Sequence, residues 1–148
     1  MGKPAASRVR VLMVDDNEQF LMSAGRYLRG RPSCELVGTA TSGEEAMVRV
    51  PSLRPDLVLV DIAMSGMSGI QLAQALKALS AAPRVVILTM YDDAAHRAAA
   101  EAAGADGFLG KEDFGENLLP LVAAMFGPLA ERPHRAASPF RRSRSDKR

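Results

Sequence analysis

The sequence lacks the residues that build disulfide or zinc frameworks, with one cysteine, Cys34, in 148 residues. A lone cysteine excludes an intramolecular disulfide framework and a zinc site made of several cysteines. Long hydrophobic runs are also missing. The first apolar run, Val9–Val14, contains Arg10 and ends at two aspartates, so it is too short for a secretory signal or a membrane span. We therefore expect a cytoplasmic protein that does not bind membranes.

Positive charge is scarce over most of the chain and concentrated near its end. Residues 131–148 hold seven Lys and Arg residues against two acidic ones, whereas the rest of the chain holds 12 basic and 15 acidic residues. We expect one domain over residues 8–127 and a basic, disordered tail over 128–148. Three interpretations of the tail stay open: a solvated extension, a weak salt-sensitive site for nucleic acid or an acidic partner, or a remnant linker. Because only Phe140 is available for base stacking, specific nucleic-acid binding is not expected.

Short apolar runs alternate with amphipathic segments of helical length. The expected strands are Val9–Val14, Cys34–Ala40, Leu57–Val60, Val85–Thr89 and 106–109. The expected helices cover about 17–29, 42–50, 70–79, 93–103 and 118–126, with Pro51 and Pro55 closing the region of the second. Since proline is tolerated only in a first turn, Pro120 places the last helix start at about 117–119 or implies a kink. The alternation predicts an α/β fold, a doubly wound parallel sheet of five strands with helices on both faces.

Acidic and polar residues stand where these strands end. Asp15 and Asp16 follow the first strand, Asp61 the third, Thr89 ends the fourth, and Lys111 follows the fifth. In an open parallel sheet these ends form one edge, where ligands bind. Crowded carboxylates repel one another, and a hard cation that prefers oxygen ligands, Mg²⁺, relieves that repulsion. One carboxylate can then attack phosphorus and form an aspartyl-phosphate.

Four segments in this order resemble the receiver domain of two-component response regulators. They are VLMVDDN at 11–17, PDLVLVDIAM at 55–64, VVILTMYDD at 85–93 and GADGFLGK at 104–111. The resemblance implies a flavodoxin-like sheet with strand order 2-1-3-4-5. It also implies a phosphoprotein that takes its phosphoryl group from a histidine kinase or a phosphotransfer protein.

The resemblance implies a role for each matching position. Asp61 is the phosphoacceptor, and Lys111 pairs with the phosphoryl group. Asp15, Asp16, Asp61 and the backbone carbonyl of Ala63 hold Mg²⁺.

Two further positions form a switch in this family. Thr89 carries the hydroxyl that moves toward the phosphoryl group. Phe108 carries an aromatic ring whose rotamer reports phosphorylation to the face of helix four, strand five and helix five. A downstream protein effector would bind that face, and homodimerisation stays open. A core aromatic without a switching role is the alternative for Phe108.

The chain also departs from the family pattern. Ser65, not proline, follows Met64, which loosens the loop after the phosphoacceptor. Glu112 replaces the proline that often follows the lysine, so the isomer of the Lys111–Glu112 bond stays open. Met90 is bulkier than the small residue common after the threonine.

Other functions remain as alternatives. The TMYDD segment at 89–93 is similar to regulators that usually carry a helix-turn-helix output domain. The chain could therefore be a DNA-binding transcription regulator whose output domain is missing or replaced by the tail. A phosphohydrolase would need a second acid where Ala63 stands, so we expect no enzyme beyond its own phosphorylation and dephosphorylation. A receiver that no longer takes phosphate is disfavoured by the intact set of site residues.

Overall fold

The computed structural model describes residues 8–127 and contains five strands and five α-helices, joined at one point by a short 3-10 turn. The elements are β1 (Val9–Val14), α1 (Glu18–Arg29), β2 (Cys34–Ala40), α2 (Gly43–Leu53), β3 (Leu57–Asp61), α3 (Gly69–Lys77), β4 (Arg84–Thr89), α4 (Ala94–Ala102), β5 (Gly107–Gly110), η1 (Lys111–Asp113) and α5 (Phe114–Phe126). All strand pairs are parallel, in the order β2-β1-β3-β4-β5. The predicted fold and strand order are confirmed. The predicted tail, 128–148, lies outside the described residues.

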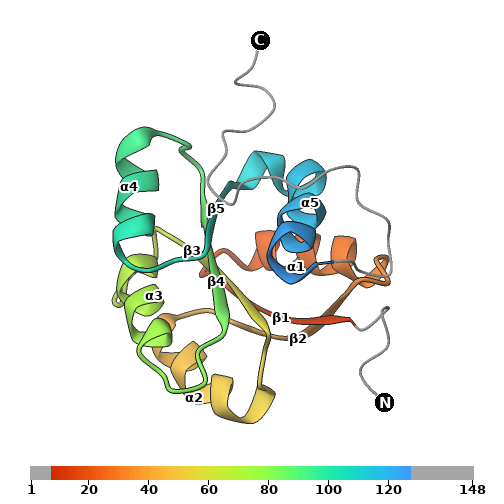
Figure 1. The fold of residues 1–148 in the computed structure, drawn as a ribbon, viewed down its shortest axis with the longest axis horizontal. Helices are drawn as coiled ribbons and strands as arrows, with labels where there is room; N and C mark the ends of the chain where they lie inside the picture. The colour runs from red at the N-terminus through yellow and green to blue at the C-terminus, as the bar shows by residue number, and fades with distance from the viewer. Residues whose placement is uncertain (1–7, 128–148) are drawn as a thin grey trace.

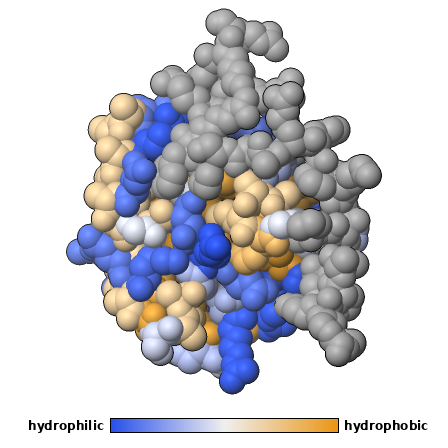
Figure 2. Space-filling model, in the orientation of Figure 1, coloured by the Kyte–Doolittle hydropathy of each residue, from blue (hydrophilic) through white to orange (hydrophobic). Residues whose placement is uncertain are grey.

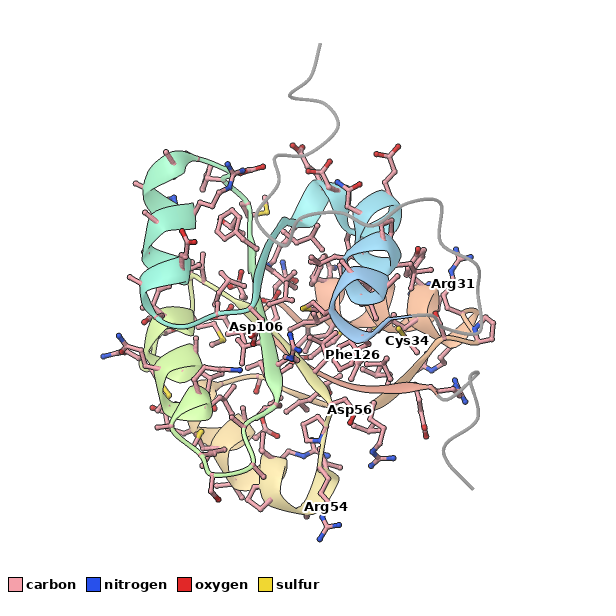
Figure 3. The ribbon with its side chains drawn as sticks, viewed as in Figure 1. Arg31, Cys34, Arg54, Asp56, Asp106 and Phe126 are labelled. Atoms are coloured by element: carbon pink, nitrogen blue, oxygen red, sulfur yellow. The ribbon has the colours of Figure 1, made fainter. Side chains whose placement is uncertain are left out.

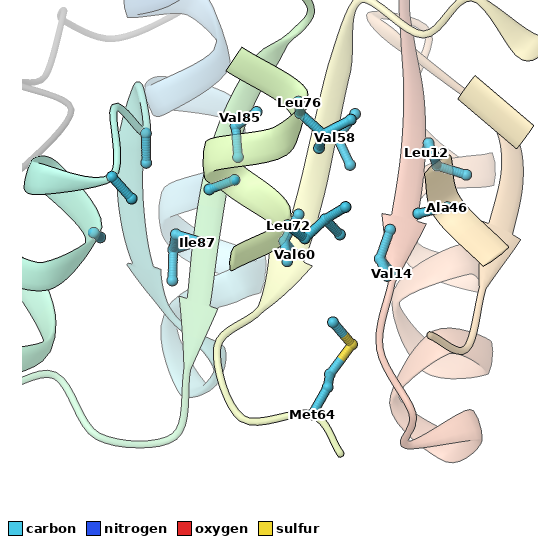
Figure 4. Packing of buried hydrophobic residues seen from close by; sticks show 14 of the residues in the cluster. Leu12, Val14, Ala46, Val58, Val60, Met64, Leu72, Leu76, Val85 and Ile87 are labelled. Carbon is cyan, nitrogen blue, oxygen red and sulfur yellow. The ribbon is translucent and has the colours of Figure 1, made fainter. Parts of the chain in front are cut away.

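Helices cover both faces of the sheet (Figure 1). On one face, α1 and α5 pack on the side chains of Val11, Met13 and their neighbours. On the other, α2, α3 and α4 pack on the side chains of Leu12, Val14, Val58 and Val60. Figure 4 shows Leu72 and Leu76 of α3 lying over Val58 and Val60. Because alternate residues of a strand point to opposite faces, the central part of a strand covered on both faces is apolar on both sides, as in Leu57–Val60 of β3.

Side-chain caps fix where the helices begin. The side chains of Asn17, Ser42, Ser68 and Asp93 each accept a hydrogen bond from a backbone N–H in the first turn. Such caps satisfy donors that have no partner within the helix. The caps at the starts of α1 and α3 matter most here, since these helices begin beside the carboxyl ends of β1 and β3.

Two prolines lie inside helices that they were expected to bound: the second helix ends between Pro51 and Pro55, and the start predicted for the last helix at 117–119 is wrong. Pro51 lies inside α2, which continues to Leu53 and ends at Arg54 in the left-handed region, with φ of 51°. Pro120 lies inside α5, which begins at Phe114 directly after the 3-10 turn. The apolar side chains of Phe114 and Leu118 are buried ahead of the proline. Burial of that face offsets the roughly 3 kcal/mol cost of an interior proline.

Two other aspartates stabilise the opposite edge of the sheet. Asp56 precedes β3, and its carboxylate accepts from the Arg10 N–H at 2.8 Å. Asp106 precedes β5, and its Oδ2 accepts from Lys77 Nζ and from the Val85 N–H, both at 2.8 Å. Figure 3 labels both residues. The hydrogen bonds of Asp56 and Asp106 give both residues a structural role. The candidate site therefore lies at the other edge of the sheet, where Asp15, Asp16 and Asp61 follow or end their strands.

Hydrophilic side chains separate patches of hydrophobic surface on the face shown in Figure 2. Large apolar side chains that stay exposed include Met22, Val48, Met90 and Tyr91. Among residues 8–127, no helix has the length and hydrophobicity needed to cross a membrane.

Gly69 is required by the close approach of α3 to the end of β3. A Cβ at this position would lie 2.2 Å from the Asp61 carbonyl oxygen and 2.7 Å from Ile62 Cα, both backbone atoms. We predict that Gly69→Ala lowers the free energy of unfolding by about 2–3 kcal/mol, because the backbone under Asp61 must shift. Chemical denaturation measures this change.

Gly115→Ala is the matched control, since its Cβ would meet only Tyr27 Cε1 at 4.0 Å, inside α5. Alanine there should stabilise the helix by about 0.5–1 kcal/mol. Equal effects of the two substitutions would contradict a specific steric requirement at Gly69.

Candidate functional site

The carboxyl ends of β1, β3, β4 and β5 bring the predicted residues to one edge of the sheet. Val14 pairs with Val60, so Asp15 and Asp61 follow at equivalent heights on neighbouring strands. The carboxylates of Asp15, Asp16 and Asp61 each place an oxygen within 4.8 Å of the others. The cluster expected from the sequence is therefore present in the structure.

The three acids differ in exposure and in partners. Asp15 and Asp61 are buried, at 1% and 4% exposed, whereas Asp16 faces solvent. Asp15 Oδ1 accepts from the Asn17 N–H at 2.9 Å, and Asp16 Oδ2 accepts from the Ser65 N–H at 3.4 Å. Two carboxylates thus form the floor of the site and one forms its open side.

Lys111 neutralises part of this negative charge. Its Nζ lies 2.7 Å from Asp15 Oδ2 and 3.2 Å from Asp61 Oδ1. The contact with Asp15 is an ion pair, although Asp15 Oδ2 receives no well-aligned hydrogen bond. Burial opposes the charge on Lys111, but the two carboxylates outweigh burial and raise its pKa. The ammonium therefore stays protonated across the physiological range.

Asp61 carries a carboxyl group whose pKa is strongly raised. Burial raises its pKa from 3.8 to about 6, with Asp15 adding to the rise, Lys111 opposing it, and Asp16 adding a smaller rise. One ammonium does not balance three carboxylates. The site therefore has an excess of negative charge around Asp61, the acid that the resemblance implies as the phosphoacceptor.

This donor set fits a magnesium ion. Three carboxylates supply only oxygen, the ligand Mg²⁺ prefers, and Asp16 leaves one side open to water and phosphate oxygens. A bound cation would also relieve the repulsion from Asp15 and Asp16, which adds to the rise in the pKa of Asp61 caused by burial. Asp15, Asp16 and Asp61 would hold the ion.

Thr89 lies at the same edge but its hydroxyl is engaged elsewhere. The Oγ1 atom accepts from the Tyr91 N–H at 3.0 Å and donates to the Tyr91 carbonyl at 3.1 Å. Thr89 is fully buried at the end of β4. In this conformation the hydroxyl stabilises its own loop.

Phe108 is buried in β5, at 4% exposed, with the Arg97 guanidinium carbon 5.4 Å from the centre of its ring. Arg97 also forms an ion pair with Asp92, in the loop that follows Thr89. Sequence reasoning did not find Arg97, because a single arginine in an alanine-rich helix gives no signal of its partner. The contact connects the loop after β4 with the ring in β5.

Two expectations about the loops have different outcomes. Among residues 8–127 no peptide bond is cis, so the open question of the Lys111–Glu112 bond is resolved as trans. Ala63 is exposed, two residues after Asp61. Its carbonyl as a metal ligand stays a prediction.

The chain belongs to the response regulator receiver domain family, which matches residues 11–122. It is a receiver domain, not a conventional enzyme, and the family implies a cognate histidine kinase. The acidic cluster is typical of the phosphate-accepting, magnesium-binding site of this family.

Individual relatives indicate which branch of the family the chain resembles. The chain is 31% identical over 109 residues to the nitrate/nitrite response regulator NarL of Escherichia coli (strain K12), covering 74% of this chain and 50% of that protein. The signal receiver domain of the putative response regulator NarL from Mycobacterium tuberculosis has a TM-score of 0.69 at 32% identity, covering 76% of this chain and 94% of that one. A LuxR-family response regulator from Aurantimonas sp. has a TM-score of 0.77 at 28% identity, covering 90% and 91%.

These similarities place the chain in the NarL/LuxR branch of response regulators. The chain spans about half the length of the curated relatives it matches, between 40% and 54%.

The raised pKa of Asp61 predicts a pH-dependent stability. Asp61 binds its proton more tightly in the folded protein than in the unfolded chain, so its contribution to stability is lost as the pH rises from 3.8 to about 6. In metal-free buffer, Asp61→Asn should raise the unfolding free energy at pH 7 by about 1–3 kcal/mol. Urea denaturation at several pH values in EDTA measures this gain, which should vanish near pH 4.

Glu101→Gln is the control, because it removes one negative charge from an exposed position of α4. It should change stability by less than about 0.5 kcal/mol at either pH. A gain for Asp61→Asn that does not depend on pH would refute burial and crowding of the carboxylate as its cause.

Proposed function

We propose that this receiver domain accepts a phosphoryl group on Asp61 from a phosphohistidine of a kinase or phosphotransfer protein, with Mg²⁺ bound by the acidic cluster. The observation that supports this most is the position of Asp61. Its carboxylate is buried within an acidic cluster, beside an ammonium at 3.2 Å, at the ligand-binding edge of the sheet. A nucleophile, a cation site and a charge partner are thus within reach of one incoming group.

The proposed transfer is a displacement at phosphorus. One Asp61 oxygen forms a bond to phosphorus while the bond from phosphorus to the donor's imidazole nitrogen breaks. The electron pair of that bond stays on the nitrogen, which takes a proton from solvent. Positioning and charge stabilisation supply most of the rate in such transfers.

Protein groups and the metal share the charge that arrives with the phosphoryl group. Bound Mg²⁺ would supply positive charge to the phosphoryl oxygens and lower the repulsion between the carboxylates. Lys111 Nζ, now held between Asp15 and Asp61, would turn one or more N–H groups to a phosphoryl oxygen. Ala63, through its backbone carbonyl, would complete the metal ligands.

The proposed output is a conformational switch. In the present structure Thr89 bonds to the backbone of Tyr91, so its hydroxyl must leave those bonds to reach a phosphoryl group on Asp61. The loop that follows carries Asp92, which holds Arg97 over Phe108. Movement of Thr89 would therefore change the packing of Phe108 and the surface of α4, β5 and α5, where a protein partner would bind.

Fewer observations support the alternative that the output is DNA binding. One relative, LiaR of Bacillus subtilis, is described as a transcriptional regulatory protein, and this chain covers 40% of it. A DNA output here would require residues 128–148 or a separate segment. We therefore limit the proposal to phosphorylation and a protein-mediated output.

Incubation with phosphoramidate and Mg²⁺ should phosphorylate the protein, giving a slower band on phosphate-affinity electrophoresis. Asp61→Asn should abolish this band because it removes the nucleophile, and EDTA should reduce it at least about ten-fold because the carboxylates then repel the donor. Asp56→Asn, at the opposite end of the same strand, is the matched control and should react like the wild type. No shifted band from the wild-type protein would exclude the proposed function.

Thr89→Ala tests the switch separately from the transfer. The variant should still be phosphorylated, since Asp61 and Lys111 are intact, but phosphorylation should no longer change the amide NMR shifts of β5 and α4. Thr89→Ser keeps the hydroxyl and should retain those changes. Equal shift changes in both variants would show that the Thr89 hydroxyl does not connect the site to Phe108.

A further inference from the structure

The ammonium of Lys111 has an aromatic neighbour that the phosphorylation chemistry described so far does not use. Lys111 Nζ lies 4.6 Å from the centre of the Phe20 ring, on α1. The same nitrogen contacts carboxylate oxygens of Asp15 and Asp61 at 2.7 and 3.2 Å. Lys111 is only 9% exposed as a side chain. The ammonium is therefore held between two carboxylates and the ring of Phe20.

The position of Phe20 is fixed from the acidic cluster itself. The Asn17 N–H donates to Asp15 Oδ1 at 2.9 Å, and the Asn17 side chain accepts from the Phe20 N–H at 3.1 Å. Asn17 thus caps α1 and sets its first turn relative to Asp15. This cap places Phe20 beside the acidic cluster.

The second support of the ring comes from α5. Phe114 meets Phe20 edge to face, with ring centres 5.6 Å apart, and meets Tyr27 in the same way at 5.7 Å. The Tyr27 hydroxyl donates to the Gly115 carbonyl at 2.8 Å. Edge-to-face pairs prefer defined orientations, so the contact with Phe114 favours this orientation of the Phe20 ring. Phe114 begins α5 and lies three residues after Lys111, which begins η1. The packing of Phe114 against Phe20 therefore also restricts where Lys111 can lie.

We propose that Phe20 is a positioning residue that holds the Lys111 ammonium at the phosphorylation site. Lysine has a long flexible stem, and its charge needs a partner that restricts it without taking its N–H donors. An aromatic face attracts the cation through its quadrupole and leaves the three N–H groups for oxygen ligands. The ammonium can then shift from the carboxylates to a phosphoryl oxygen while it stays against the ring. This inference rests on the proposed function.

A purely structural role for Phe20 makes different predictions. The ring is half-buried and also contacts Phe114, so its loss could act through packing alone. In that case the effect would not depend on the charge of Lys111. A positioning role requires that the effect vanish when that charge is absent.

The test measures the rate of phosphorylation by phosphoramidate with Mg²⁺ in the full chain. Phe20→Leu keeps an apolar side chain but removes the aromatic face, and should lower the rate about three- to ten-fold. Phe20→Tyr retains the ring and should restore the rate to within about two-fold of wild type. Met22→Ala is the matched control, because it removes an exposed apolar side chain from the same helix, and should leave the rate within about two-fold.

The decisive comparison repeats Phe20→Leu in a Lys111→Gln background, where the substitution should have no further effect. An equal loss in both backgrounds, or no loss in either, would overturn the inference.

Phe20→Met replaces Phe20→Leu if circular dichroism shows that the leucine variant is not folded. If wild-type protein takes no phosphate at all, the proposed function fails and the inference with it. If the wild-type protein is phosphorylated and the Phe20 variants react equally fast, the inference about Phe20 is wrong while the proposed function stands.

Discussion

Repulsion among three carboxylates at one edge of the sheet is the constraint that organises this receiver domain. Their oxygens lie within 4.8 Å of one another, and within residues 8–127 the ammonium of Lys111 alone forms an ion pair with them, which leaves the cluster negative. Coulomb repulsion at such distances is substantial for buried groups, so the cluster is stable only because the surrounding fold holds it. The parallel strands, the caps and the helices together stabilise an arrangement that the acids alone would avoid.

The sequence was sufficient to predict this cluster because its geometry follows from the class of fold. Asp15 and Asp61 each end a continuous apolar run, and strands in a parallel sheet end on one side. The helical layers followed from the same alternation, whereas the strand order came from the resemblance to receiver domains. Pro51 and Pro120 lie inside helices because tertiary burial outweighs the local helix propensity of proline. In the folded protein, burial of the apolar face of α5 outweighs the cost of its proline.

Other features could not be read from the sequence because they depend on rotamers and loop paths. Nothing in the pattern indicates that Thr89 bonds to Tyr91, or that Arg97 lies over Phe108. Phe20 lies within the first helix expected from the sequence, about 17–29, and nothing in the pattern gives it a role at the site. Its contact with Lys111 requires the relative placement of α1 and η1, which pattern arguments do not determine. The role of Ala63 and of residues 128–148 stays a prediction.

The same excess of negative charge suggests how phosphorylation of Asp61 would change the structure around β5. In the present structure both ends of the proposed switch are satisfied: Thr89 bonds to the Tyr91 backbone, and Arg97 pairs with Asp92 over Phe108. A phosphoryl group would add charge that attracts the nearest free donors, and Thr89 would have to give up two hydrogen bonds to respond. Those bonds hold the loop that carries Asp92. The energetic gain at Asp61 would therefore be transmitted through the Asp92–Arg97 pair as a change in packing around β5.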